Sequence, residues 1–308
     1  MSELFRLREQ PAARELYLLA GWQQWADAGN ISSGLPEYLV ERTGARPIGE
    51  LNVSGCYLFQ VPGTHHFLRP EIKLVEGHRE SLTRHTNRFY YTESGDRGLV
   101  IFVGDEPHVD VERYAEAFFG MVKKLGVRRV VALGGVYAPT PFDKAREIHT
   151  IYSLPHLKEE LEHYAVKFSN YEGGVTIGSY LVDRAEQEGI ELLSLYGFVP
   201  AYDLSQLSQK LEGIRIETDY RAWFEIMRRV NHMFGLWIDL SDLGSKGDEL
   251  TEEFAAKLRE LDGKMPQLKM KEHLASLAQD YTELPFMQLD SMWEAELDDI
   301  LGQMDDEP

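Results

Sequence analysis

The sequence predicts a three-layer α/β fold, with a largely parallel sheet flanked by helices and an α-helical C-terminal extension. From Gly98 onward, apolar strand-sized runs alternate with amphipathic helical patterns. Residues 99–103 and 128–133 read as strands, and residues 109–125 read as the helix between them, with apolar side chains at three- and four-residue spacing. Repeated strand–helix–strand units with short connections are typical of a parallel sheet covered on both faces.

The remaining elements follow from the same signals. Strands are expected at residues 15–21, 47–53, 71–75, 88–93, 166–170 and 190–196, and helices at 31–42, 177–187, 219–234, 250–261, 269–281 and 291–304. The glycine-rich polar stretch at residues 244–248 is the best linker candidate. It predicts an α/β core domain over residues 1–243 and an acidic helical extension over residues 244–308.

Charge and composition exclude several classes of protein. The chain has 308 residues and a formal net charge of −19, and residues 241–308 hold eighteen Asp or Glu against six Lys or Arg. An acidic chain without a basic patch repels phosphate backbones, so we expect no nucleic-acid partner. The longest apolar run, residues 99–103, is too short for a membrane span, and the charged N-terminus does not resemble a signal peptide. We therefore expect a cytoplasmic protein with no membrane partner.

Common catalytic and cofactor motifs do not occur. The chain contains no GxxxxGK[ST] phosphate loop, no GxGxxG after a strand, no GxSxG elbow and no HExxH pair. Its single cysteine, Cys56, builds neither a disulfide nor a thiolate metal cage. These absences predict no metal and no cofactor, and they assign no catalytic residue.

Polar and glycine residues nevertheless gather where the predicted strands end. Because ligands of open α/β sheets bind at the carboxyl ends of the strands, these residues form a candidate ligand pocket. Its members are Asp27, Asn30, Asp105, Glu106, Gly134, Gly135, Asp143, Gly173 and Gly174. Clustered carboxylates there would raise one another's pKa and serve as acid or base, whereas Asp105 also suits the capping of the next helix. Gly173 and Gly174 precede a helix start, where they either hold an anion or allow a tight turn.

Aromatic residues in the same loops have two interpretations. Trp22, Trp25, Tyr137 and Phe142 either stack on a ligand or form a contact between subunits, and the subunit contact is preferred. We expect the chain to associate with itself as a dimer or a trimer, and to bind another protein through such a surface.

Short motifs in a fixed order resemble the proteasome-assembly-chaperone family. They span residues 15–243 and comprise Gly21-Trp22 with Asp27-Ala28-Gly29, Gly104-Asp105-Glu106-Pro107, Leu133-Gly134-Gly135, Tyr171-Glu172-Gly173-Gly174, Gly197-Phe198-Val199-Pro200-Ala201-Tyr202 and Gly235-Leu236-Trp237-Ile238-Asp239. The resemblance implies a three-layer fold similar to purine nucleoside phosphorylases, assembly into dimers or trimers, and a place in a bacterial branch with a helical C-terminal extension. Members that dock on proteasome rings end in a hydrophobic residue, Tyr and one more residue. The last residues here, Asp305-Asp306-Glu307-Pro308, differ from that pattern, and Ala201 stands where the family commonly has histidine.

Two functional hypotheses follow. The first is a non-catalytic, homo-oligomeric scaffold or assembly-chaperone-like protein. The second is an enzyme or sensor that binds a nucleoside-like or carboxylate-bearing small molecule at the strand ends, as a nucleoside phosphorylase or an ATP-grasp-like ligase would.

Overall fold

The computed structural model describes residues 4–60, 69–203, 213–266, 269–279, 281–284 and 286. The helix expected at residues 291–304 lies outside these described residues.

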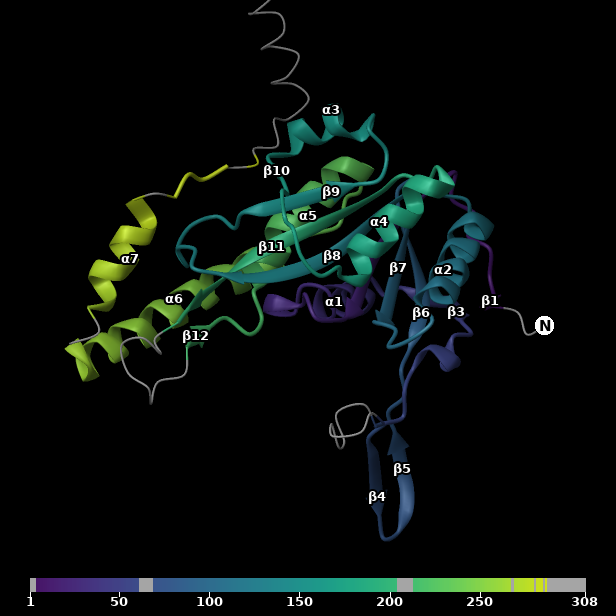
Figure 1. The fold of residues 1–308 in the computed structure, drawn as a ribbon, viewed down its shortest axis with the longest axis horizontal. Helices are drawn as coiled ribbons and strands as arrows, with labels where there is room; N and C mark the ends of the chain where they lie inside the picture. Colours follow the sequence, from purple (N-terminus) through teal and green to yellow (C-terminus); the bar gives the residue numbers. More distant parts are fainter. Residues whose placement is uncertain are drawn as a thin grey trace, which may run out of the picture.

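A mixed sheet of ten strands forms the centre of the described chain (Figure 1). Its strands are β1 (Phe5–Leu7), β2 (Glu15–Gln23), β3 (Arg46–Leu51), β6 (Asn87–Ser94), β7 (Arg97–Asp105), β8 (Val127–Ala138), β9 (Ile148–Tyr152), β10 (Lys167–Phe168), β11 (Leu192–Tyr202) and β12 (Ile214–Arg215). They follow the order β1-β3-β6-β7-β2-β8-β11-β9-β10, and β12 pairs with β11. The central strands β7, β2, β8 and β11 run parallel, whereas β6 and β9 flank them in antiparallel pairing.

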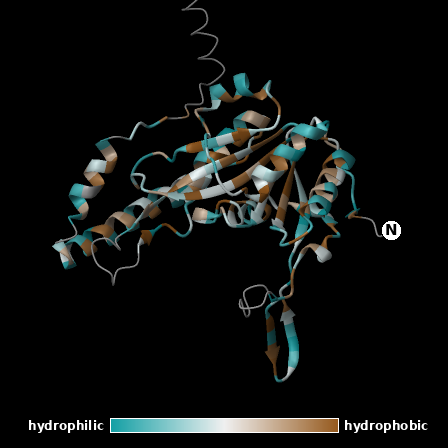
Figure 2. Cartoon of the chain, in the orientation of Figure 1, coloured by the Kyte–Doolittle hydropathy of each residue, from teal (hydrophilic) through white to brown (hydrophobic). Residues whose placement is uncertain are grey.

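Helices cover both faces of this sheet. They are α1 (Gly34–Thr43), α2 (Val111–Leu125), α3 (Leu157–Leu161), α4 (Ile177–Glu188), α5 (Tyr220–Phe234), α6 (Ser241–Lys264) and α7 (Met270–Gln279), with short 3₁₀ turns η1 (Ala28–Asn30), η2 (Ser54–Cys56) and η3 (Glu162–Tyr164). One buried cluster joins α1, α5 and α6 to one face, and a second joins α2 and α4 to the other. In Figure 2 the central strands are largely hydrophobic and the helices carry hydrophilic residues on their outer sides. The predicted three-layer α/β class is therefore confirmed.

The glycine pair Gly134-Gly135 does not end its strand. Strand β8 continues to Ala138, and the pairing with β11 continues through Gly135↔Gly197 to Ala138↔Pro200. Both glycines are buried. The strand extends because a neighbouring strand supplies hydrogen bonds beyond the point where the local apolar run stops.

The prediction of a linker at residues 244–248 is wrong. These residues lie inside α6, which begins at Ser241. A Cβ at Gly247 would lie 3.3 Å from the Cα of Arg221, and one at Gly244 would lie 3.7 Å from the ring of Phe224. The two glycines thus permit close packing of α6 against α5. The division into domains at residues 1–243 and 244–308 stays a prediction.

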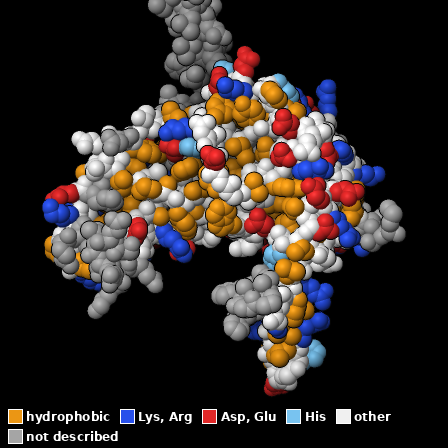
Figure 3. All heavy atoms as spheres, in the orientation of Figure 1, with side chains coloured by type: hydrophobic (Ala, Val, Ile, Leu, Met, Phe, Trp, Pro, Cys, Tyr) orange, Lys and Arg blue, Asp and Glu red, His pale blue; other side chains and the backbone are white. Residues whose placement is uncertain are grey.

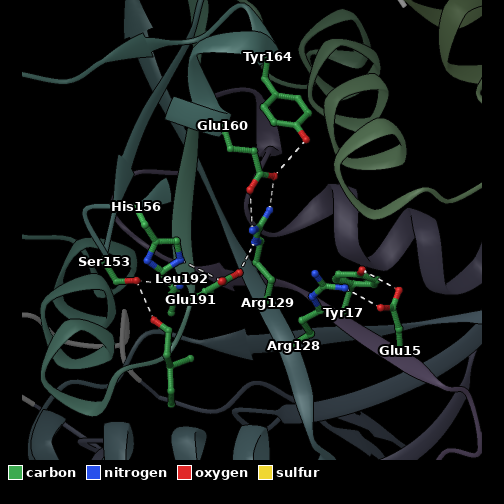
Figure 4. A network of polar contacts seen from close by, with 11 residues as sticks. Glu15, Tyr17, Arg128, Arg129, Ser153, His156, Glu160, Tyr164, Glu191 and Leu192 are labelled. Atoms are coloured by element: carbon green, nitrogen blue, oxygen red, sulfur yellow. Dashed lines mark hydrogen bonds and ion pairs between the residues drawn. The ribbon is translucent and has the colours of Figure 1, made fainter. Parts of the chain in front are cut away.

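The end of the sheet where the central strands begin is closed by ion pairs (Figure 4). Arg129 contacts both carboxylate oxygens of Glu160, at 2.5 and 2.8 Å, and contacts Glu191 at 2.7 Å. The hydrogen bonds from Arg129 hold the pKa of Glu160 below its ordinary value. Next to them, Arg128 pairs with Glu15 at 2.6 Å. These charges are matched to one another, so this end of the sheet has a structural role.

A two-stranded hairpin projects from the body of the molecule (Figure 1). Its strands are β4 (Ile72–Val75) and β5 (His78–Leu82), and they pair only with each other among the described strands. The sequence predicted β4 and missed β5. Ile72, Leu74 and Val75 are exposed on this hairpin.

Candidate functional site

The candidate site lies at the carboxyl ends of β2 and β8, beside the loop that leads into α4. A backbone bridge between Asp27 and Gly135, with the Gly135 amide donating to the Ala26 carbonyl at 2.8 Å, extends the pairing past the end of β2. The loop after β2 is therefore held against β8. The parallel topology brings these strand ends together, as the sequence predicted.

The Asp27 carboxylate holds the turn that leads to α1. Its Oδ1 accepts hydrogen bonds from the amides of Ser32 at 2.7 Å and Ser33 at 3.0 Å, and its Oδ2 accepts from the Ser33 hydroxyl at 2.6 Å. Burial raises the pKa of Asp27, and these three hydrogen bonds oppose that rise. Asp27 does have carboxylate neighbours, because burial, Glu41, Asp105 and Asp27 together raise the pKa of Glu37 on α1. The arrangement fits a structural turn better than a pair of catalytic carboxylates.

Glu106 connects two loops that are distant in the sequence. Its Oε1 accepts from the Ile177 amide at 3.0 Å, at the start of α4, and its Oε2 accepts from the Trp25 amide at 3.2 Å. Asp105 caps no helix, contrary to one of the two roles proposed for it. It ends β7, and its Oδ2 accepts from the Thr86 amide at 2.6 Å. Both carboxylates therefore serve main-chain amides.

The four predicted glycines differ in whether the structure has room for a side chain at their positions. A Cβ at Gly135 would lie 2.0 Å from the Ala28 carbonyl oxygen, and one at Gly134 would lie 2.4 Å from the Tyr196 ring. Close packing requires glycine at both positions. Gly174 has no atom near its missing Cβ, and neither Gly173 nor Gly174 has a positive φ.

The start of α4 offers few open donors to an anion. The Ile177 amide is taken by Glu106, and the Ser179 amide is taken by the Thr176 hydroxyl at 3.1 Å in a capping box. Internal acceptors thus already take two of the amides that an anion at this helix start would use.

The two remaining polar candidates are Asn30 and Asp143. Asn30 has a φ of 49°, in the left-handed region, and its Nδ2 donates to the Thr218 hydroxyl at 3.0 Å. Asp143 lies in the loop between β8 and β9. Asp27 and Glu106 are joined through the loop after β2, but Asp143 makes no hydrogen bond or ion pair with them.

The aromatic residues predicted to form a subunit contact lie in different surroundings. Trp22 is fully buried, and its Nε1 donates to the Tyr114 hydroxyl at 2.8 Å, so it offers no surface to a partner. Phe142 packs against Phe254 of α6, with ring centroids 5.5 Å apart. Tyr137 lies under the guanidinium of Arg215 at 5.3 Å.

Trp25 and three residues that the sequence analysis missed are exposed apolar side chains of the loops and strand at this edge of the sheet, and we call the four the rim patch. Its members and their exposed fractions are Trp25 (73%), Val136 (38%), Tyr171 (67%) and Val175 (68%). Trp25 and the residues before α4 meet at Glu106, and Val136 follows the Gly135 bridge directly. Figure 3 shows hydrophobic side chains gathered over β8 and β11 in the orientation of Figure 1. A signal existed for Val136, because the apolar run resumes after the glycine pair.

Within the described part of the chain, no three His, Cys, Asp or Glu side chains are grouped so that they could hold a metal ion. Of the helices that the structure describes, none combines the length and apolar character that a bilayer crossing requires.

Comparison with known proteins then places the chain in a family. The model of the PAC2 family matches residues 21–258. The chain belongs to the PAC2 family. The match includes the end of β2, the strand ends beside it and most of α6, so the rim patch lies wholly within the part that the family shares. No curated protein matches the chain closely enough to be a relative.

Solved structures of the PAC2 family and its neighbours share the fold. A proteasome-assembly chaperone homologue from Mycobacterium tuberculosis is 21% identical, with a TM-score of 0.66 over 78% of this chain and 94% of that one. A Corynebacterium glutamicum protein of unknown function is 13% identical, with a TM-score of 0.71 over 96% and 99%. Pyrococcus furiosus PbaB, an archaeal proteasome activator, is 20% identical, with a TM-score of 0.57 over 83% and 98%.

Proposed function

We propose that this protein is a non-catalytic, homo-oligomeric assembly-chaperone-like protein, and that the rim patch is its docking face. The observation that carries the proposal is a contrast within one site. The strand-end carboxylates of Asp27 and Glu106 are occupied by main-chain amides, whereas Trp25, Tyr171 and Val175 beside them face solvent. A site with satisfied polar groups and exposed aromatic residues suits protein contact better than bond chemistry.

The structural neighbours also support a role in protein binding. Among the structural neighbours are an assembly-chaperone homologue and a proteasome activator, and such roles depend on protein surfaces. The alternative, a nucleoside phosphorylase-like or ATP-grasp-like enzyme at these strand ends, is not favoured, because its candidate carboxylates already hold the loops in place.

We propose a second copy of the chain as the first occupant of the rim patch. Tryptophan and tyrosine dominate the energetics of protein interfaces when they are buried at their centre. Trp25 is held at its amide by Glu106 and keeps most of its ring exposed. Its main chain is thus ordered before binding, which lowers the entropic cost of association.

The variant Trp25→Ala tests this assignment. We expect the dissociation constant of the oligomer to rise by about 30-fold or more, since a central interface tryptophan contributes at least about 2 kcal/mol. Sedimentation equilibrium over a range of protein concentrations measures the change. Trp237→Ala is the matched control, because Trp237 is even more exposed but lies between α5 and α6. Equal association of both variants, or a monomeric wild-type chain at every concentration, would contradict the proposal.

A further inference from the structure

A surface hollow of about 580 Å³ lies at the base of the β4–β5 hairpin, and its lining shares no residue with the rim patch. Its walls come from the end of β3, from the segment around η2, and from the residues that lead into β6. Its volume is within the range of small-molecule sites. The lining side chains that matter for its chemistry are Glu50, Tyr57, Phe59, Arg84, His85 and Arg88.

Two arginines give this hollow a positive charge in a strongly acidic chain. Arg84 and Arg88 are exposed, and neither makes an ion pair or a side-chain hydrogen bond with any residue that the structure describes. Glu50, the acidic side chain in the described lining, stands opposite Arg88 in the pairing of β3 with β6, but its ion pair is with Arg8 at 2.8 Å. Two guanidinium groups beside one hollow thus form no ion pair within the described part of the chain, although the whole chain has a net charge of −19.

An aromatic wall stands next to these arginines. The Tyr57 ring stacks on the His85 ring, with centroids 4.2 Å apart and planes 10° apart. The Nδ1 of His85 lies 3.5 Å from a carboxylate oxygen of Asp105. Phe59 also lines the hollow and is exposed, and the guanidinium of Arg69 lies over one face of its ring, 4.9 Å from the centroid, which leaves the other face to a ligand. The hollow therefore combines cations with flat apolar faces.

Hydrogen bonds fix the Tyr57 wall to the protein core. The Tyr57 hydroxyl donates to the Asp105 carbonyl at 2.7 Å and accepts from the Asn87 amide at 2.8 Å. Asn87 in turn accepts from the Tyr114 hydroxyl at 2.6 Å, and Tyr114 accepts from the buried indole of Trp22 at 2.8 Å. Burial raises the pKa of Tyr57, so this wall stays uncharged at neutral pH. A wall held in this way needs little reorganisation to receive a ligand.

We propose that this hollow binds a small molecule that joins an oxyanion to a planar ring. Arg84 and Arg88 receive the oxyanion, a phosphate or a carboxylate, through charge-assisted hydrogen bonds. The planar ring rests against Tyr57 and Phe59. An extended polyanion such as nucleic acid is disfavoured, because the net charge of the chain repels it.

Titration calorimetry with four probes tests the proposal. The probes are adenosine monophosphate, benzoate, adenosine and inorganic phosphate. We expect heat of binding with adenosine monophosphate, with benzoate or with both, and much weaker binding of adenosine, which lacks the anion. Binding of adenosine monophosphate alone identifies the oxyanion as phosphate, and binding of benzoate alone identifies it as carboxylate. Binding of adenosine as tight as that of adenosine monophosphate, or no binding of any probe, would overturn the proposal.

A pair of variants ties the binding to the two arginines. Arg84→Gln and Arg88→Gln are each expected to weaken binding about 10-fold or more, because each removes hydrogen bonds to a charged group. Both side chains touch no described polar partner, so the fold is retained, which circular dichroism checks. Arg79→Gln, an exposed arginine on β5 outside the hollow, is the matched control and is expected to bind as wild type. Unchanged affinity in Arg84→Gln and Arg88→Gln would overturn the assignment of the site.

Discussion

Replacing Asp219 with alanine is expected to lower the free energy of unfolding by about 3–5 kcal/mol, since it leaves a buried charge without its partner. Asp219 is fully buried, Arg146 is 1% exposed, and Arg146 Nε lies 2.7 Å from Asp219 Oδ2. Arg146 Nη2 donates to Asp219 Oδ1 at 3.4 Å, and Arg146 Nη1 donates to the carbonyls of Phe142 and Lys144 at 2.9 Å, so the guanidinium is held inside the protein.

The same substitution removes the cap of α5. Asp219 Oδ1 accepts from the Ala222 amide at 3.1 Å, which satisfies one of the free donors at the start of that helix. Asp219 also lies against Gly29, whose carbonyl accepts from the Asp219 amide and the Trp223 indole, both at 3.0 Å. Loss of this carboxylate therefore weakens the packing of α5 against η1 and against the loop after β8.

Denaturant unfolding measures this effect, with Asp239→Ala as the matched control. Asp239 pairs with Arg42 at 3.0 Å, but both side chains are largely exposed. Exposed ion pairs contribute little to stability, so the control is expected to unfold close to wild type. Equal losses of stability in the two variants would show that the burial of the Arg146–Asp219 pair has no special importance.

A second large effect is expected from Gly135→Ala, which is predicted to cost about 3 kcal/mol or more because a methyl group is forced against main chain. Its Cβ would lie 2.0 Å from the carbonyl oxygen of Ala28 and 2.8 Å from the Ala28 nitrogen. Main chain cannot rotate away as a flexible side chain can. The bridge between Asp27 and Gly135 must then open, and the loop that carries Trp25 must move.

Gly174→Ala is the matched control for this substitution. No atom lies within 4 Å of the position that its Cβ would take, and its φ is not positive. Its unfolding midpoint in a thermal melt is expected to match wild type, whereas that of Gly135→Ala falls. A Gly135→Ala protein as stable as wild type would mean that the loop after β2 is not held against β8 as described.

The pattern of apolar residues within a segment predicted the helices and strands whose burial is set by that segment alone. The helical stripe of residues 109–125 and the strand at 99–103 became α2 and β7, because apolar periodicity fixes which face is buried. The extension of β8 to Ala138 and the helical state of Gly244 and Gly247 were not predicted. Both depend on a neighbouring element, β11 in one case and α5 in the other, which no local window contains.

At the candidate site, too, contacts between residues distant in the sequence were not predicted. The sequence placed Asp27, Glu106 and Gly135 at adjoining strand ends, and the parallel topology brings them together. It did not show that Glu106 binds the amide of Ile177, 71 residues later. The burial of Trp22 could have been predicted, because residues two apart in a strand point to the same face of the sheet. Trp22 therefore shares a face with Leu18 and Ala20, and all three belong to the second buried cluster.

The most direct test of the docking face is the reactivity of a cysteine placed in it. Cys56 is buried and is the chain's single cysteine, so Val175→Cys gives one accessible thiol within the rim patch. Val75→Cys, on the exposed hairpin strand β4, is the matched control. Maleimide labelling is measured at low and at high protein concentration. We predict that labelling at residue 175 slows as concentration rises while labelling at residue 75 does not. Labelling at residue 175 that is independent of concentration would contradict a docking face at the strand ends.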